Sequence, residues 1–138
     1  MEWFVLAVLS AFFAVLVAIF AKIGLQGVDS DVATAVRAIV MMVFIVTFVV
    51  SIGKGPQLTQ LTGKDAGFIV LSGIAGALSW LFYFAALKLA DASKVAPIDK
   101  ASILFVLVLS ALLLGEKITL KIAIAGVLIF IGVLLLAV

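Results

Sequence analysis

The chain has 138 residues, of which 67% are hydrophobic and 12% charged, and its mean hydropathy is +1.52. A soluble domain is about half apolar and about one-quarter charged, so this composition excludes a soluble globular protein. The net charge of +2 is spread along the chain, which argues against a nucleic-acid partner. The sequence contains no cysteine and no histidine, which removes disulfides, thiolate chemistry and the commonest metal ligand. We therefore expect neither a metal site nor a cofactor.

Five apolar stretches follow one another along the chain, at residues 3–23, 32–52, 66–87, 95–114 and 118–138. Each is close to the roughly 20 residues that cross about 30 Å of hydrocarbon. We therefore predict an all-α integral membrane protein with five transmembrane helices, which form one domain over residues 1–138. The connections are short, so consecutive helices must run antiparallel. An odd number of spans places the two termini on opposite sides of the membrane, as in half of a larger unit.

The connections contain signals for helix starts. Either Ser30 or Asp31 is suited to cap the second helix. Thr62 and Asp65 resemble a capping box that opens the third helix. Pro97 fits the first turn of the fourth helix, where its missing N–H costs little.

Small residues form a stripe on each of two helices, at spacings of three and four residues. The stripe on the first helix consists of Ala7, Ala11, Ala14, Ala18 and Ala21, and that on the third consists of Ser72, Gly76, Ser79 and Tyr83. Small residues allow helices to pack closely in lipid, which explains the alanine stripe. The stripe on the third helix is polar and ends in an aromatic residue, so it suits either packing or the border of a solute path.

Charged residues inside the spans are costly and are candidates for function. Arg37, Asp99 and Lys100 lie at similar shallow depths on the same side of the membrane. One interpretation is a vestibule in which Arg37 pairs with Asp99, so that Arg37 or Lys100 meets an anionic solute. The alternative is a solvated rim, because long side chains at this depth can reach water.

Trp80 lies in the middle of the third helix, although tryptophan prefers membrane interfaces. Tyr83 and Phe84 follow one turn later, so the three rings can form an aromatic wall or can simply pack. The sequence shows no phosphate-binding loop, no metal cluster and no serine with a neighbouring base, so we predict no catalytic residue and no enzymatic activity. It also shows no carboxylate in the middle of a helix that could exchange protons for lipophilic cations.

The positive charges of the connections are nearly balanced between the two sides. One side has Lys54, Lys64, Lys117 and Lys121, and the other has Lys22, Lys88 and Lys94, with Arg37 and Lys100 slightly inside the helices. The first helix has lysine only after it and the last has lysine near its start, so the flanking charges disagree about orientation. We expect insertion in both orientations, which allows antiparallel dimers; a single orientation with weak signals is the alternative.

Three strings resemble the EamA domain of the drug/metabolite transporter superfamily in its single-domain form. They are AKIGLQGVDSDVATAVR at residues 21–37, SWLFYFAALKLADASKVAPIDK at 79–100 and LLLGEKIT at 112–119, followed by a last helix with Gly126 and Gly132. The resemblance covers the whole chain. The sequence departs from the family at Ala85, where relatives often carry a basic residue.

The resemblance implies a five-helix, EamA-like bundle that longer relatives contain twice, as inverted repeats with the solute path between them. Here a second copy of the chain would supply the second repeat. We expect a multi-pass protein of the prokaryotic plasma or inner membrane that transports a small metabolite, amino-acid-like or otherwise anionic or zwitterionic, as an antiparallel homodimer. The substrate-path candidates are Arg37, Ser72, Gly76, Ser79, Trp80, Tyr83 and Lys100. The alternative is a non-transporting membrane subunit that packs against a partner protein or lipid.

Overall fold

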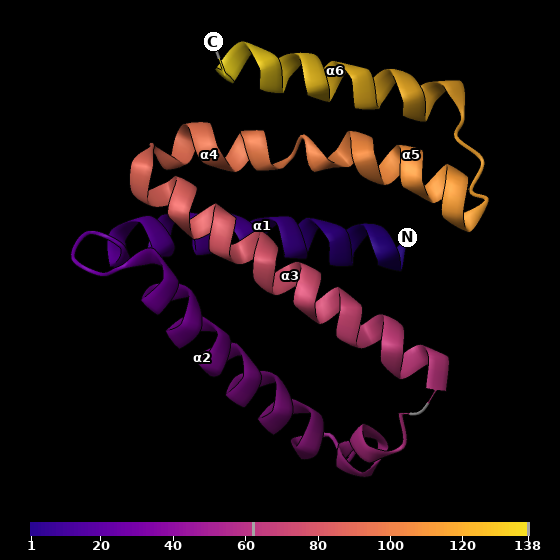
Figure 1. The fold of residues 1–138 in the computed structure, drawn as a ribbon. Coiled ribbons are helices and arrows are strands. Elements are labelled where there is room, and N and C mark those ends of the chain that lie inside the picture. The colour runs from indigo at the N-terminus through magenta and orange to yellow at the C-terminus, as the bar shows by residue number, and fades with distance from the viewer. Residues whose placement is uncertain (62, 138) are drawn as a thin grey trace. The chain divides into compact units, whose positions relative to one another are not determined.

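The computed structural model describes residues 1–61 and 63–137, and every regular element in this part of the chain is helical. The elements are α1 (Glu2–Gly24), α2 (Ser30–Ser51), the 3₁₀-helix η1 (Gly55–Thr59), α3 (Gly63–Leu89), α4 (Ala92–Asp99), α5 (Ser102–Leu114) and α6 (Leu120–Ala137) (Figure 1). The all-helical prediction is therefore confirmed for the described residues. The predicted capping box at Thr62 and the last residue of the predicted fifth helix, Val138, lie outside them.

Four stretches are long and apolar enough to span a membrane: Glu2–Gly24, Ser30–Ser51, Gly63–Leu89 and the combined α4 and α5, Ala92–Leu114. The remaining apolar helix, Leu120–Leu136, is shorter. At about 1.5 Å per residue it lies near the lower limit for crossing the hydrocarbon. The count of five spans therefore stays a prediction.

The second helix begins two residues earlier than predicted, and neither predicted residue caps it. The side chain of Asp29 accepts hydrogen bonds from the backbone N–H groups of Asp31 (2.9 Å) and Val32 (3.3 Å). Aspartate is as good a cap as serine, and capping from position 29 leaves Asp31 in the first turn, where a negative charge is favourable.

The predicted fourth helix is two helices. It begins at Ala92, three residues before the predicted start, and is interrupted at Lys100 and Ala101. Pro97 therefore lies inside α4 rather than in its first turn. Proline lacks the N–H that would bond the carbonyl four residues back, and its ring crowds that carbonyl, so it weakens the helix around it.

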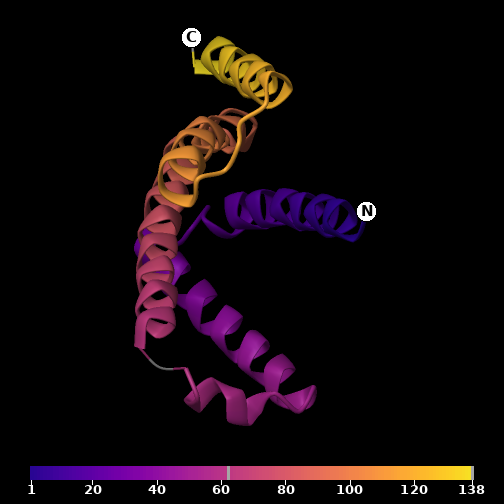
Figure 2. The ribbon, with the colours of Figure 1, turned by 90° about the vertical axis from the view of Figure 1, so that its right-hand side faces the viewer.

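The structure forms two compact units, Phe20–Leu89 and the terminal unit of Met1–Ile19 with Ala90–Val138. We call the first the hairpin unit, because α2 and α3 run antiparallel within it and are joined through η1 (Figures 1 and 2). The most deeply buried side chains of the hairpin unit are Leu25, Thr34, Phe84 and Leu87. They belong to the end where α2 begins and α3 ends, so the core of this unit lies there.

In the terminal unit, α6 packs against α4 and α5. Val95 of α4 and Val133 of α6 are buried. Gly126 of α6 lies so close to α5 that a Cβ atom there would stand 2.5 Å from Leu107 Cδ1. The absence of a side chain at Gly126 is what allows this approach.

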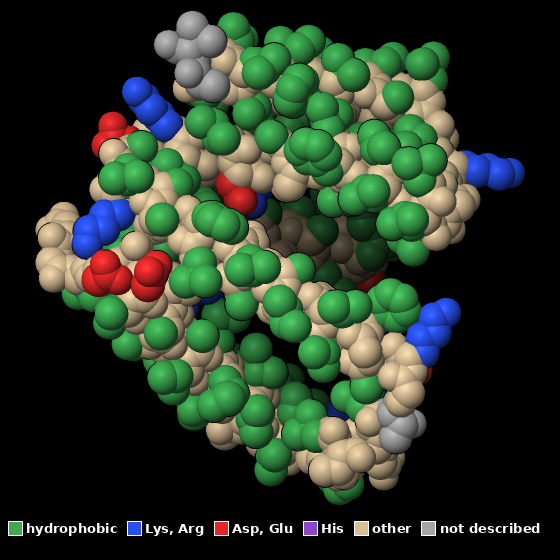
Figure 3. Space-filling model, in the orientation of Figure 1, with side chains coloured by type: hydrophobic (Ala, Val, Ile, Leu, Met, Phe, Trp, Pro, Cys, Tyr) green, Lys and Arg blue, Asp and Glu red, His purple; other side chains and the backbone are tan. Residues whose placement is uncertain are grey.

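Large apolar side chains are exposed along all the long helices, and the face seen in Figure 3 is mostly hydrophobic. In α1, Ala18 is the buried residue, while Phe12 and Phe13 are more than half exposed. A water-soluble protein rarely exposes large apolar side chains along the whole length of its helices. This surface suits hydrocarbon as its surroundings.

Candidate functional site

The guanidinium of Arg37 lies over an aromatic side chain of the neighbouring helix. Its Cζ atom is 3.4 Å from the centroid of the Trp80 ring and 5.6 Å from that of Phe84. Arg37 is on α2 and the two rings are on α3, so the antiparallel packing of the hairpin unit creates the contact. A cation over the face of tryptophan is attracted by the ring quadrupole, with a free energy of about 0.5–2 kcal/mol that increases with desolvation.

Two more rings hold Trp80 in place. The Trp80 and Tyr83 centroids are 5.5 Å apart at an interplanar angle of 82°, and those of Trp80 and Phe84 are 5.8 Å apart at 69°. Residues three and four positions apart share one face of a helix, which explains why these rings meet. Phe84 is only 3% exposed, so it anchors the group in the core of the unit. We call Arg37, Trp80, Tyr83 and Phe84 the arginine cluster.

The stacked geometry of Arg37 leaves its hydrogen-bond donors available. Among the described residues, Arg37 forms neither a hydrogen bond nor an ion pair, and its recorded contacts are with the two rings. Contact with a ring face leaves the planar fork of N–H groups without an oxygen acceptor. That fork matches a carboxylate, which it can bind through two parallel hydrogen bonds. The cluster can therefore hold an anionic group.

The polar stripe of α3 leads away from the cluster toward the start of the helix. Thr34 and Ser51 of α2 donate to backbone carbonyls of their own helix, as membrane hydroxyls commonly do. Within the described residues, the exposed hydroxyls of Ser72 and Ser79 have no such partner. A Cβ atom added at Gly76 would meet no atom within 4 Å. Gly76 therefore does not pack within the hairpin unit, and the hydroxyls of Ser72 and Ser79 are open to a solute or to a second helix.

Two lysines tie the ends of the hairpin unit together. Lys22 of α1 donates from Nζ to the backbone carbonyl of Leu87 at 2.6 Å, and Lys88 of α3 donates to that of Val28, also at 2.6 Å. The carbonyls in the last turn of a helix lack internal partners and carry partial negative charge, so Lys22 caps the end of α3. These bonds fix the end of the hairpin on which the arginine cluster is built.

Asp99 and Lys100 belong to the terminal unit, and their side chains pair with one another: Lys100 Nζ is 2.9 Å from Asp99 Oδ2. Because α4 begins at Ala92, Asp99 is the eighth residue of its span and lies about 10–12 Å along it, deeper than predicted. Arg37, the eighth residue of α2, is about as deep in its own span. The predicted pair of Arg37 with Asp99 would join the two units, and it stays a prediction.

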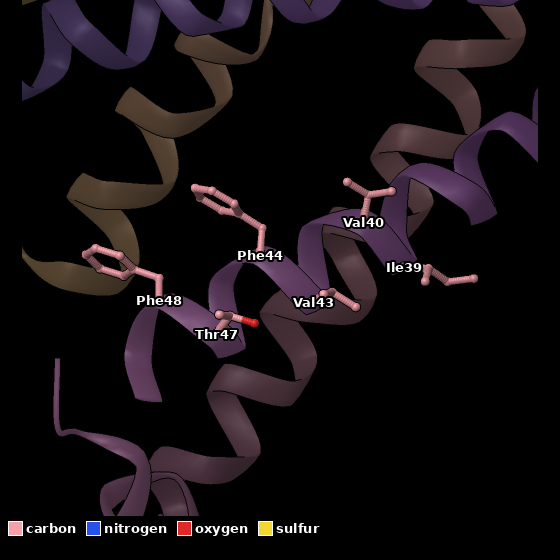
Figure 4. A pocket seen from close by; sticks show the side chains of 6 residues that line it. All are labelled: Ile39, Val40, Val43, Phe44, Thr47 and Phe48. Atoms are coloured by element: carbon pink, nitrogen blue, oxygen red, sulfur yellow. The ribbon is translucent and has the colours of Figure 1, made fainter. Parts of the chain in front are cut away.

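A groove on α2 has a volume of about 550 Å³. It is lined by Ile39, Val40, Val43, Phe44, Thr47 and Phe48, which lie along successive turns of the helix (Figure 4). Thr47 supplies its one hydroxyl, so the groove offers almost nothing for polar recognition. The sequence reasoning did not single it out, although these positions repeat every four residues along one helical face.

The sequence reasoning also missed the stack of Arg37 on Trp80. A signal for it does exist, because an antiparallel hairpin brings together positions equally far from its turn. Arg37 and Trp80 are nearly equidistant along the chain from Leu58 in the connection. With the hairpin predicted, this register would have paired them.

Comparison with known proteins decides the family. The model of the EamA-like transporter family matches residues 1–138. The chain belongs to this family. A curated relative from Sinorhizobium sp., described as an uncharacterized transporter in the cobO 3′ region, is 44% identical over 137 residues, which cover 99% of this chain and 97% of the relative. No solved structure matches the chain.

Membership of the EamA-like transporter family confirms the predicted resemblance and supports membrane transport in general. It indicates a transporter rather than an enzyme. Together with the long apolar helices, it also supports a multi-pass protein whose surroundings are a lipid bilayer. Neither the family description nor the relative's name gives a solute.

Proposed function

We propose that this chain transports a small anionic or zwitterionic metabolite, such as an amino acid, and that two antiparallel copies form the transporter. The observation that carries the proposal is the guanidinium of Arg37, held on the face of Trp80 with its N–H donors unused. In this proposal Arg37 binds the carboxylate of the solute. Trp80 and Tyr83 contact its apolar part, and Ser72, Gly76, Ser79 and Lys100 border the path.

The environment of Arg37 favours a carboxylate ligand. A charge inside a membrane span is costly unless it is paired or solvated. Within the described residues the guanidinium has only aromatic faces as partners, and these compensate part of that cost. A bound carboxylate would supply the missing charge and two hydrogen bonds, which gives the site its preference for an anionic group.

The dimer follows from the architecture of transporters built from inverted repeats, which place their sites at the interface of the repeats and alternate access by moving one against the other. A single copy with the predicted odd number of spans would supply one repeat. The nearly balanced lysines on the two sides allow the same chain to insert in both orientations. We propose the plasma or inner membrane of a prokaryote as the location.

The test is uptake of radiolabelled amino acids and small carboxylates into proteoliposomes, after a thermal-shift screen of the same solutes. Trp80→Leu and Lys100→Gln should each lower uptake at least tenfold, which corresponds to about 1.4 kcal/mol of lost interaction. Both variants should remain monodisperse dimers; Lys100→Gln should melt close to the wild type, and Trp80→Leu a few degrees lower because it loses the contact with Arg37. Phe82→Leu and Lys121→Gln are matched controls, because Phe82 is 74% exposed on α3 and Lys121 lies near the start of α6.

Two results would contradict the proposal. Normal uptake by both Trp80→Leu and Lys100→Gln would return these residues to a packing role and leave the site unlocated. A stable complex with another membrane protein, together with no stabilisation or uptake of any solute, would favour a non-transporting subunit instead.

A further inference from the structure

Asp99 differs from every other carboxylate of the chain in its position. The chain has seven Asp and Glu residues. The other six lie within one turn of the end of a candidate membrane span or in a connection: Glu2, Asp29, Asp31, Asp65, Asp91 and Glu116. Asp99, the eighth residue of the span Ala92–Leu114, is the one that lies deeper. Acidic residues inside membrane spans are rare, and proton relays are among their established uses.

The backbone around Asp99 leaves the α-helical pattern. The N–H groups of Lys100 and Ala101 bond the carbonyls of Pro97 and Ile98, each three residues back, at 2.9 Å. The N–H of Ile103 likewise bonds the carbonyl of Lys100 at 3.0 Å. This is a short 3₁₀ turn inside a span, before its midpoint. Adjacent residues of a regular α-helix do not face one another, whereas here Lys100 Nζ reaches Asp99 Oδ2 at 2.9 Å.

The Asp99–Lys100 ion pair is partly exposed and can break and form again. The side chain of Lys100 is 56% exposed and that of Asp99 is 36% exposed. The contact is a single hydrogen bond to one carboxylate oxygen, and no other bond to this carboxylate is formed by the described residues. A structural ion pair inside a protein needs additional hydrogen bonds to offset the loss of hydration. One open bond leaves both groups accessible to a proton and to a solute.

The other charges of the terminal unit lie toward the ends of its helices or in the connection between α5 and α6, which carries Glu116 and Lys117. On α4 and its cap, the charged neighbours are Asp91 and Lys94, both in or before the first turn, and α5 carries none. The helix packed against α4 and α5 is α6, whose one charged side chain is Lys121, near its start. The part of α1 in this unit contributes Glu2 and the amino terminus. Lys100 is therefore the charged group in direct contact with Asp99.

We propose that Asp99 binds the proton that drives uptake. The ammonium of Lys100, released from Asp99, then forms an ion pair with the carboxylate of the solute. This inference rests on the proposed function, because it assigns the coupling ion of that same transport. A proton adds to Asp99, the ion pair between Oδ2 and Nζ breaks, and the freed ammonium of Lys100 pairs with the incoming carboxylate. Release reverses these steps: the solute leaves Lys100, the proton leaves Asp99, and the pair forms again. One proton moves with one solute carboxylate, in the same direction.

The experiment measures uptake of ¹⁴C-labelled L-leucine and L-glutamate into proteoliposomes, with the membrane potential clamped at zero by potassium and valinomycin. With the outside more acidic by one pH unit, the wild-type protein should accumulate its solute about tenfold, the full value for one coupled proton. In Asp99→Asn, which cannot exchange a proton, the ratio of uptake with and without the gradient should fall to about one. Asp99→Ser replaces it if the asparagine variant is not monodisperse.

Two controls define the result. Asp91→Asn makes the same chemical change on the same helix at the N-cap position, where the side chain forms no capping bond, and it should retain the response to the gradient. Asp99→Glu keeps a carboxylate and should retain it as well. Counterflow of the labelled solutes without any gradient tests transport itself.

The outcomes separate the two proposals. Counterflow by the wild-type protein without a response to the pH gradient, or a response that persists in Asp99→Asn, would overturn proton coupling at Asp99 and leave the transport proposal standing. The absence of counterflow for both solutes would count against transport of amino-acid-like solutes, and the coupling inference would fall with it.

Discussion

The stack of Arg37 on Trp80 should be measurable as a coupling between the two residues in the stability of the protein. Arg37→Gln removes the cation and Trp80→Leu removes the ring, while both keep a side chain of substantial volume. The distance of 3.4 Å and the support of Phe84 place the contact toward the strong end of such interactions, so we expect a coupling free energy of about 1–2 kcal/mol. The double variant should therefore be less destabilised than the sum of the two single variants.

The assay is thermal unfolding of the purified protein in detergent, for the wild type, the two single variants and the double variant. For a chain of this size, 1 kcal/mol shifts Tm by about 3–4 °C, so the deviation from additivity should be about 3–8 °C. A parallel cycle of Arg37→Gln with Phe82→Leu is the control, because Phe82 is a highly exposed ring of the same helix. Additivity within about 0.5 kcal/mol in the Arg37 and Trp80 cycle would refute the stacked geometry as a source of stability.

Three further predictions concern other parts of the chain. Gly126→Val should destabilise the protein by about 1–3 kcal/mol in thermal unfolding, because its new atoms would collide with Leu107, whereas Gly132→Val, where the space is open, should have a much smaller effect. If the predicted pair of Arg37 and Asp99 forms, Arg37→Ala and Asp99→Ala should show a coupling on the order of 1 kcal/mol, and strict additivity would argue for two separately solvated charges. A single cysteine placed near either terminus should be labelled by an impermeant thiol reagent in roughly half of the molecules in intact cells, whereas complete labelling from one side would exclude dual topology.

The helical architecture was predictable because its signals are local. Apolar runs near 20 residues long and short polar connections define membrane helices whatever their tertiary contacts. The interruption at Lys100 was not predictable in this way. A hydropathy profile does not detect the interruption, because Ala92–Leu114 is apolar enough to be assigned as one continuous span. Pro97 was the available signal, but a start assumed at residue 95 placed it in a first turn, where proline does no harm.

The candidate residues were named from the sequence, but the contacts that the structure shows for Arg37 and Asp99 were not predicted. Arg37 and Asp99 were assigned to one another because opposite charges at similar depth reduce the cost of burial. That pair stays a prediction, and the structure shows that each residue also has a partner that charge matching does not reveal: a ring face for Arg37 and the adjacent residue for Asp99. The first depends on the register of a hairpin and the second on a local change of helical pitch. Neither contact can be predicted from the depth of a residue in its span.

The choice of partner matters for transport, because it decides which donors a solute can use. An arginine that is already paired with a protein carboxylate can bind a solute anion fully only after that carboxylate is displaced. Breaking a desolvated charge pair costs free energy. A ring face attracts the guanidinium without occupying any N–H group, so the donors stay available to the solute. Lys100 is in the opposite position, since its ammonium is engaged by Asp99 until that carboxylate is neutralised. In the mechanism proposed here, the N–H donors of Arg37 are always available to an anion, whereas the ammonium of Lys100 becomes available only when Asp99 is protonated. Solute binding at Lys100 therefore depends on the coupling ion.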